Sequence, residues 1–110
     1  MSPNTENSDS PANKIYIKVY TVQNEVLVAA CDAELIGKTL KEGEIEFHVS
    51  KEFYADVLGD EELLKKHLAN ATIANLVGHR AVKCGIEVGI IDKENVIKIA
   101  GIPHAQFALL

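Results

Sequence analysis

ATIANLVGHRAVKCGIEV, residues 71–88, is the longest segment of this chain with a helical pattern. At 100° per residue its small and apolar side chains gather on one half of a helix. The other half is polar and carries Asn75, His79, Arg80 and Lys83. The pattern predicts one long amphipathic helix over 71–88, with these four side chains in solvent.

The apolar half of this predicted helix is unusually small in volume, because it contains Ala74, Gly78, Ala81 and Gly85. Glycine inside a helix costs roughly 0.5–1 kcal/mol relative to alanine, so we expect another backbone to approach Gly78 and Gly85 closely. The sheet of the same chain is one such neighbour. A symmetry mate is the alternative, and it would make the protein a structural homodimer.

The segments on either side of 71–88 predict strands and a second helix. The strands are expected at 15–22, 25–31, 44–49, 96–100 and 105–109. A short helix is expected after Asp60, whose side chain suits an N-cap. The strand at 25–31 is apolar on both sides, which is typical of a central strand covered on both faces. We therefore predict an α+β fold, an antiparallel sheet of about five strands with one short and one long helix packed on it.

Length and composition allow one domain in this chain of 110 residues. Residues 1–13 contain no large apolar group except Met1, so we predict a disordered polar tail followed by a single α+β domain over 14–110. No apolar run reaches the roughly 18 residues that a membrane span needs. The first residues lack the charged-then-apolar order of a signal peptide, so we do not expect export. Cys31 and Cys84 lie in apolar segments and are expected to be buried free thiols. We therefore expect a cytoplasmic protein without a membrane partner.

Motifs for cofactor or metal chemistry are missing from the sequence. Gly37-Lys38-Thr39 resembles the end of a phosphate-binding loop, but that loop needs glycine where this chain has Asp32. The four histidines lie in different segments and have no zinc-ligand spacing. We predict no cofactor, no metal and no catalytic residue, which favours a protein that is not an enzyme.

Two groups of side chains are candidates for binding. The first is a partly basic surface where the polar face of the predicted long helix meets the turn after residue 100; its members are Asn75, His79, Arg80, Lys83, His104 and Gln106. The second is one face of the first strand, where Tyr16, Lys18 and Tyr20 alternate. Tyrosines in such a row also occur beneath a helix with their hydroxyl groups at its rim, and the net charge of −5 favours that interpretation.

Four motifs carry a resemblance to a known family: ATIANLVG at 71–78, the following RAV at 80–82, GIPHAQ at 101–106 and DAELIGKT at 32–39. Together they resemble the archaeal family catalogued as domain of unknown function 424, whose members are small single-domain proteins. The resemblance runs from about Lys14 to Leu110. It implies a cytosolic archaeal protein, and it supplies no catalytic residues to transfer. An association of the family with translation or RNA handling is a further implication.

These observations predict a small non-catalytic binding module that acts with RNA or with a protein of the translation machinery. Arg80 and Lys83 are expected to meet phosphate or acidic groups, and Asn75 and Gln106 to add directional hydrogen bonds. The alternative from another class is a small enzyme that uses His104 as general acid or base in a pocket beside the long helix. The homodimer is a third hypothesis.

Overall fold

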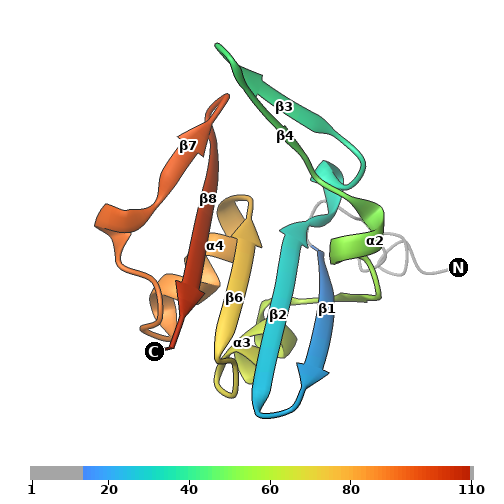
Figure 1. The fold of residues 1–110 in the computed structure, drawn as a ribbon, viewed down its shortest axis with the longest axis vertical. Coiled ribbons are helices and arrows are strands. Elements are labelled where there is room, and N and C mark those ends of the chain that lie inside the picture. Colours follow the sequence, from blue (N-terminus) through green and yellow to red (C-terminus); the bar gives the residue numbers. More distant parts are fainter. Residues whose placement is uncertain (1–13, 110) are drawn as a thin grey trace, which may run out of the picture.

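A computed structural model of the protein describes residues 14–109, and Figure 1 shows its fold. The chain has a mixed α+β fold, as predicted. The tail predicted at residues 1–13 lies outside the described residues. No helix in the described part of the chain has both the length and the apolar character to cross a membrane.

A six-stranded sheet forms the centre of the molecule, with strand order β5-β1-β2-β6-β8-β7. Its strands are β1 (Ile15–Val22), β2 (Glu25–Asp32), β5 (Val57–Gly59), β6 (Ile73–Val77), β7 (Ile97–Ile99) and β8 (Ile102–Ala108). Neighbouring strands pair antiparallel, except that β2 and β6 run parallel. A separate antiparallel hairpin consists of β3 (Thr39–Glu42) and β4 (Ile45–His48). The predicted count of about five strands was therefore too low, and the sheet is mixed.

Short helices connect and cover these strands. The α-helices are α2 (Lys51–Tyr54), α3 (Glu61–Leu68) and α4 (His79–Glu87), and the 3₁₀ helices are η2 (Ala33–Leu35) and η3 (Lys93–Asn95). The predicted cap of the short helix is confirmed, because Oδ1 of Asp60 accepts a hydrogen bond of 2.9 Å from the backbone N–H of Leu63. Helix α2 and strands β3 and β5 were not predicted from the sequence.

The prediction of one long helix over 71–88 was wrong. The segment forms strand β6, a turn at Gly78 and helix α4. Strand β6 pairs with β2 along one edge and with β8 along the other, and Ala74, Leu76 and Val77 are buried. A strand that is apolar on both faces lacks the alternation that distinguishes it from a helix, which explains the error.

The sequence predicted that another backbone approaches Gly78 and Gly85, but at both glycines the nearest atoms belong to side chains of the same chain. A Cβ atom at Gly85 would lie 2.6 Å from Cδ1 of Leu76 in the sheet and 2.7 Å from Cγ1 of Ile91. Ala74, Gly78 and Ala81 are buried as well. This set of small residues therefore packs within one chain, and it is not a surface through which two copies could associate.

Two apolar clusters cover the two faces of the sheet. Helices α3 and α4 pack on one face through residues such as Leu64, Leu68 and Val82. Helix α2 and the β3–β4 hairpin pack on part of the other face, where Tyr54 and Val49 are buried. In Figure 1, α3 and α4 lie behind the sheet and α2 lies beside β1. The part of the front face formed by β6 and β8 is less covered.

Candidate functional site

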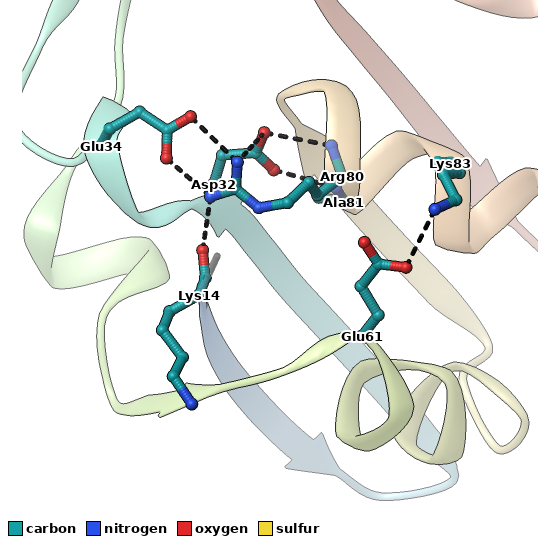
Figure 2. A network of polar contacts seen from close by, with 7 residues as sticks. All are labelled: Lys14, Asp32, Glu34, Glu61, Arg80, Ala81 and Lys83. Atoms are coloured by element: carbon teal, nitrogen blue, oxygen red, sulfur yellow. Dashed lines mark hydrogen bonds and ion pairs between the residues drawn. The ribbon is translucent and has the colours of Figure 1, made fainter. Parts of the chain in front are cut away.

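The junction between β6 and α4 is closed by a buried carboxylate. Asp32 ends strand β2, and its side chain is 1% exposed. Its Oδ2 accepts a hydrogen bond of 3.1 Å from the backbone N–H of Arg80, and its Oδ1 accepts one of 2.9 Å from that of Ala81 (Figure 2). The first amides of a helix often bind an external anion. Here the chain's own carboxylate binds them, so this helix end is not available to a ligand.

Arg80 belongs to the same polar network and is not the solvated charge that the sequence predicted. Its Nη2 lies 2.6 Å from Oε1 of Glu34 and donates a hydrogen bond of 2.7 Å to the carbonyl oxygen of Lys14. Its Nη1 lies 3.6 Å from Oδ2 of Asp32. Burial raises the pKa of Asp32, while the backbone N–H groups of Arg80 and Ala81 and then the guanidinium of Arg80 oppose that effect. We conclude that Arg80 holds β1, η2 and α4 together.

Lys83 and His79 face a groove between α4 and the segment that contains η3 and β7. The groove has a volume of about 490 Å³, and its lining residues are His79, Val82, Lys83, Ile86, Glu87, Lys93, Val96, Lys98 and Pro103. Val82, Ile86, Val96 and Pro103 supply an apolar lining. Nζ of Lys83 lies 3.2 Å from Oε1 of Glu61, an exposed ion pair (Figure 2). The groove is therefore apolar, with cationic side chains around it.

The acidic residue that lines this groove is in an ion pair, whereas two of its lysines are in none within the described part of the chain. Glu87, its one acidic lining residue, pairs with Lys65 at 2.7 Å. Within residues 14–109, Lys93 and Lys98 make no ion pair. These two lysines were not among the binding residues predicted from the sequence. The only signal was for Lys98, whose position among Val96, Ile97 and Ile99 predicts a lysine on a strand. That pattern does not say what the lysine faces.

Asn75, His104 and Gln106 lie on the face of the sheet away from α4, not beside Arg80 and Lys83. Oδ1 of Asn75 accepts a hydrogen bond of 2.5 Å from the hydroxyl of Tyr54 in α2. Nε2 of His104 lies 3.3 Å from the same oxygen. Because a carboxamide oxygen can only accept, Nε2 of His104 carries the proton in this contact. The predicted single binding surface is thus divided between two faces of the sheet.

His104 is buried at 8% exposure, and its ring lies against that of Phe47 with centroids 4.9 Å apart. Burial lowers the pKa of His104, since the charged form would lose its hydration. The histidine is therefore neutral at pH 7. No carboxylate within the described part of the chain makes a hydrogen bond or ion pair with it.

Two hollows flank this polar cluster on the front face of the sheet. The larger has a volume of about 350 Å³ and is lined by Leu27, Phe53, Ile73, Ala74, Asn75, Gln106, Phe107 and Ala108. The smaller, of about 250 Å³, is lined by Asn95, Ile97, His104, Ala105 and Gln106. Gln106 belongs to both. Phe53 and Tyr54 were not predicted as site residues, because the short helix that carries them was not predicted.

The second candidate surface, Tyr16, Lys18 and Tyr20, lies partly beneath helix α2, as the preferred interpretation predicted. The hydroxyl of Tyr20 donates a hydrogen bond of 2.8 Å to the carbonyl oxygen of Phe53, and their rings stack with centroids 5.6 Å apart. Nζ of Lys18 donates one of 2.8 Å to the carbonyl oxygen of Glu52. These side chains anchor α2 to the sheet.

Cys31 and Cys84 are buried free thiols, which confirms their predicted state. Burial raises the pKa of Cys31 to about 12 and that of Cys84 to about 11. Neither is a thiolate at neutral pH, so neither is an activated nucleophile. Among residues 14–109, no three histidine, cysteine, aspartate or glutamate side chains gather in a way that could hold a metal ion.

Comparisons with known proteins place this arrangement in a family. The chain is similar in structure to an uncharacterized conserved protein from Methanopyrus kandleri, whose crystal structure superimposes with a TM-score of 0.76. The two share 23% sequence identity over 88% of this chain and 92% of the other, a likeness that shows the fold alone. No curated protein matches the sequence. The model of one family, protein of unknown function DUF424, matches residues 20–110, which confirms the resemblance inferred from the sequence. The chain therefore belongs to the DUF424 family.

Proposed function

We propose that this protein is a small, non-catalytic RNA-binding module of the cytoplasm, and that the groove between α4 and β7 contacts the RNA. The observation that supports the proposal is the composition of this groove. The groove has a volume of about 490 Å³ and a partly apolar lining. Its cationic and polar border is formed by Lys83, Lys93, Lys98 and His79. Arg80 takes no part, because its guanidinium is bound to Glu34 and to the carbonyl of Lys14.

The local charge of the groove supports an anionic partner despite the net charge of −5. Lys93 and Lys98 are exposed, and Glu87 is paired with Lys65. Phosphate groups bind lysine without requiring a fixed geometry, so a lysine border suits a flexible sugar–phosphate chain. The aliphatic side chains between the lysines give the faces of unstacked bases a nonpolar surface to pack on. A single-stranded segment satisfies both requirements at once.

A titration with RNA tests this proposal. Fluorescence polarisation would follow the binding of a labelled single-stranded oligomer, and of tRNA and rRNA fragments, at several salt concentrations. Each phosphate contact on a single strand contributes a slope of about −0.7 to the dependence of log K on log salt, so three lysine contacts predict a slope of about −2. Binding no stronger than that of an unrelated acidic protein would contradict the proposal. Capture of an acidic protein of the translation machinery, with no affinity for RNA, would also contradict it.

One contact favours a second candidate function, a small enzyme with His104 as general acid or base. His104 lines a hollow and has a polar partner, since its Nε2 lies 3.3 Å from Oδ1 of Asn75. With the proton on Nε2, only Nδ1 can accept a proton. Carbethoxylation by diethylpyrocarbonate tests this function, because a catalytic base must be reachable. Reaction of His104 as fast as that of exposed His48 or His79 would support it, and protection of His104 would exclude it.

A further inference from the structure

We propose that the hollow between Asn75, Gln106 and Phe53 on the front face of the sheet holds one unpaired pyrimidine base, with uracil preferred. This inference rests on the proposed function, since the base belongs to the RNA strand that the α4–β7 groove contacts. It adds a second site on the opposite face and a preference among bases. Three features of the hollow support it.

The first feature is the fixed carboxamide of Asn75. Its Oδ1 accepts hydrogen bonds from the hydroxyl of Tyr54 and from Nε2 of His104, at 2.5 and 3.3 Å. Both lone pairs of this oxygen are therefore occupied by contacts within the protein. Its Nδ2 still carries two N–H donors, for which residues 14–109 supply no hydrogen-bond partner. Asn75 lines the hollow. It therefore presents donors, and no acceptor, to a ligand there.

The second feature is the position of Gln106 beside Asn75. The two residues are direct partners in the antiparallel pair β6–β8, so their side chains leave the same face of the sheet about 5 Å apart. Gln106 is exposed and makes no side-chain hydrogen bond within the described part of the chain. Its carboxamide offers one acceptor and two donors. The pair together presents donor, acceptor and donor groups.

The third feature is the aromatic wall supplied by Phe53. Its ring stacks on Tyr20 at 5.6 Å and meets the ring of Tyr54 edge-on at 4.8 Å. The one-turn helix that carries it is held to β1 by the hydrogen bonds of Lys18 and Tyr20. The wall is therefore fixed before a ligand arrives. With Leu27 and Ile73 also in the lining, the hollow has an apolar part for a flat ring and a polar part for its edge.

The hydrogen-bonding edges of the bases decide which one fits. Uracil presents a carbonyl, an N–H and a second carbonyl in a row, which complements the donor, acceptor and donor groups of Asn75 and Gln106. Cytosine also offers a carbonyl to the donors of Asn75. The Watson–Crick edge of adenine has one donor and one acceptor, so it satisfies Gln106 and leaves the Asn75 donors unmatched. A pyrimidine is therefore favoured over adenine.

Strand β7, at the edge of the sheet, lies between this hollow and the groove between α4 and β7. Val96 and Lys98 line the groove on the helix side, whereas Asn95 and Ile97 line the small hollow on the front side. Gln106 joins that small hollow to the larger one. Strand β7, which separates the two sides, has three residues. A strand of RNA that crosses β7 thus contacts lysines on one side and carboxamides on the other.

The experiment compares three labelled ten-unit strands with the same phosphates: oligouridylate, oligoadenylate and a strand without bases. For the wild-type protein we expect oligouridylate to bind about tenfold more tightly than the strand without bases, which corresponds to about 1.4 kcal/mol for one seated base. Oligoadenylate should lie between them. Gln106→Ala should remove the preference for uracil and leave the affinity for the strand without bases and the salt slope unchanged. Asn24→Ala removes an exposed carboxamide from the β1–β2 turn, which does not line the hollow, and serves as the matched control.

A second measurement separates this inference from the proposed function. Free uridine, titrated at millimolar concentration, should shift the side-chain amide resonances of Asn75 and Gln106 in NMR spectra, and free adenosine should shift them less. Suppose that the oligomers bind with a salt-dependent affinity but without base preference, and that uridine causes no such shift. The proposed base site is then contradicted, whereas RNA binding by the groove between α4 and β7 is supported. If uridine shifts these resonances and no oligomer binds, the RNA-binding function fails although the hollow takes the base. Equal affinity of wild-type protein and Gln106→Ala for oligouridylate overturns the inference.

Discussion

Asp32 occupies the space that a side chain at Gly78 would need. A Cβ atom on Gly78 would collide with the Asp32 carboxyl group, with Oδ1 at 2.6 Å and Oδ2 at 2.7 Å. The φ angle of Gly78 is 107°, which L-residues rarely adopt. The glycine lets the chain turn from β6 into α4 while the carboxylate bonds to the first amides of the helix.

Gly78→Ala should therefore destabilise the protein by about 3 kcal/mol, from backbone strain together with displacement of a buried carboxylate. Urea unfolding measures the change. Gly89→Ala is the control, because Gly89 also has a positive φ of 89° but has open space around it. We expect a loss of about 1 kcal/mol there, from strain alone. Equal losses for the two variants would show that the fit between Asp32 and Gly78 contributes nothing.

Arg80→Leu should destabilise the protein by about 2–3 kcal/mol, because it leaves the buried Asp32 without its cationic partner and removes the hydrogen bonds to Glu34 and Lys14. Lys83→Leu should change the stability little, since its ion pair with Glu61 is exposed. Thermal or urea unfolding of both variants checks the difference. A smaller loss for Arg80→Leu than for Lys83→Leu would contradict the role of Arg80 as a clamp.

The stability of the protein should depend on the protonation of His104. Burial lowers its folded-state pKa below the ordinary value of 6.5, so the unfolded chain takes up a proton first as the pH falls. The stabilising contribution of the neutral ring is complete above pH 6.5 and is lost as the pH falls through the folded pKa. The slope from this group is at most about 1.4 kcal/mol per pH unit. His104→Gln should flatten the unfolding free energy between pH 7 and 5 relative to wild type, and an unchanged slope would contradict the assignment.

The parts of the fold that sequence predicted are those with a local signal. The alternation of residues 15–22, the turn at Gln23 and Asn24, and the cap at Asp60 are all found in the structure. Gly89, which follows the C-cap Val88 of α4, has a positive φ of 89°, the conformation that glycine commonly supplies after a helix end. Each of these features depends on side chains within a few residues of one another. Local chemistry was therefore sufficient to place them.

The parts that sequence could not predict depend on distant partners. The apolar pattern of 73–77 fits a helix as well as a strand covered on both faces, and only the pairing with β2 and β8 separates them. Arg80 has the sequence position of a solvated helix residue, yet its partners Asp32 and Glu34 lie more than 40 residues away in the chain. The prediction placed Asn75 and Lys83 on one helix. Because residues 73–77 form a strand instead, the predicted site is divided between the two faces of the sheet.

A matched pair of charge reversals tests the proposed RNA contact most directly. The first variant combines Lys93→Glu with Lys98→Glu in the groove. The second combines Lys38→Glu with Lys66→Glu, two exposed lysines outside the groove that also make no ion pair within residues 14–109. Both change the net charge by the same amount, so nonspecific repulsion of RNA is equal. Polarisation with one labelled single-stranded RNA at fixed salt should show at least a tenfold greater loss of affinity for the groove variant, which corresponds to about 1.4 kcal/mol. Equal losses for the two variants would contradict the assignment of the groove between α4 and β7 as the RNA-binding site.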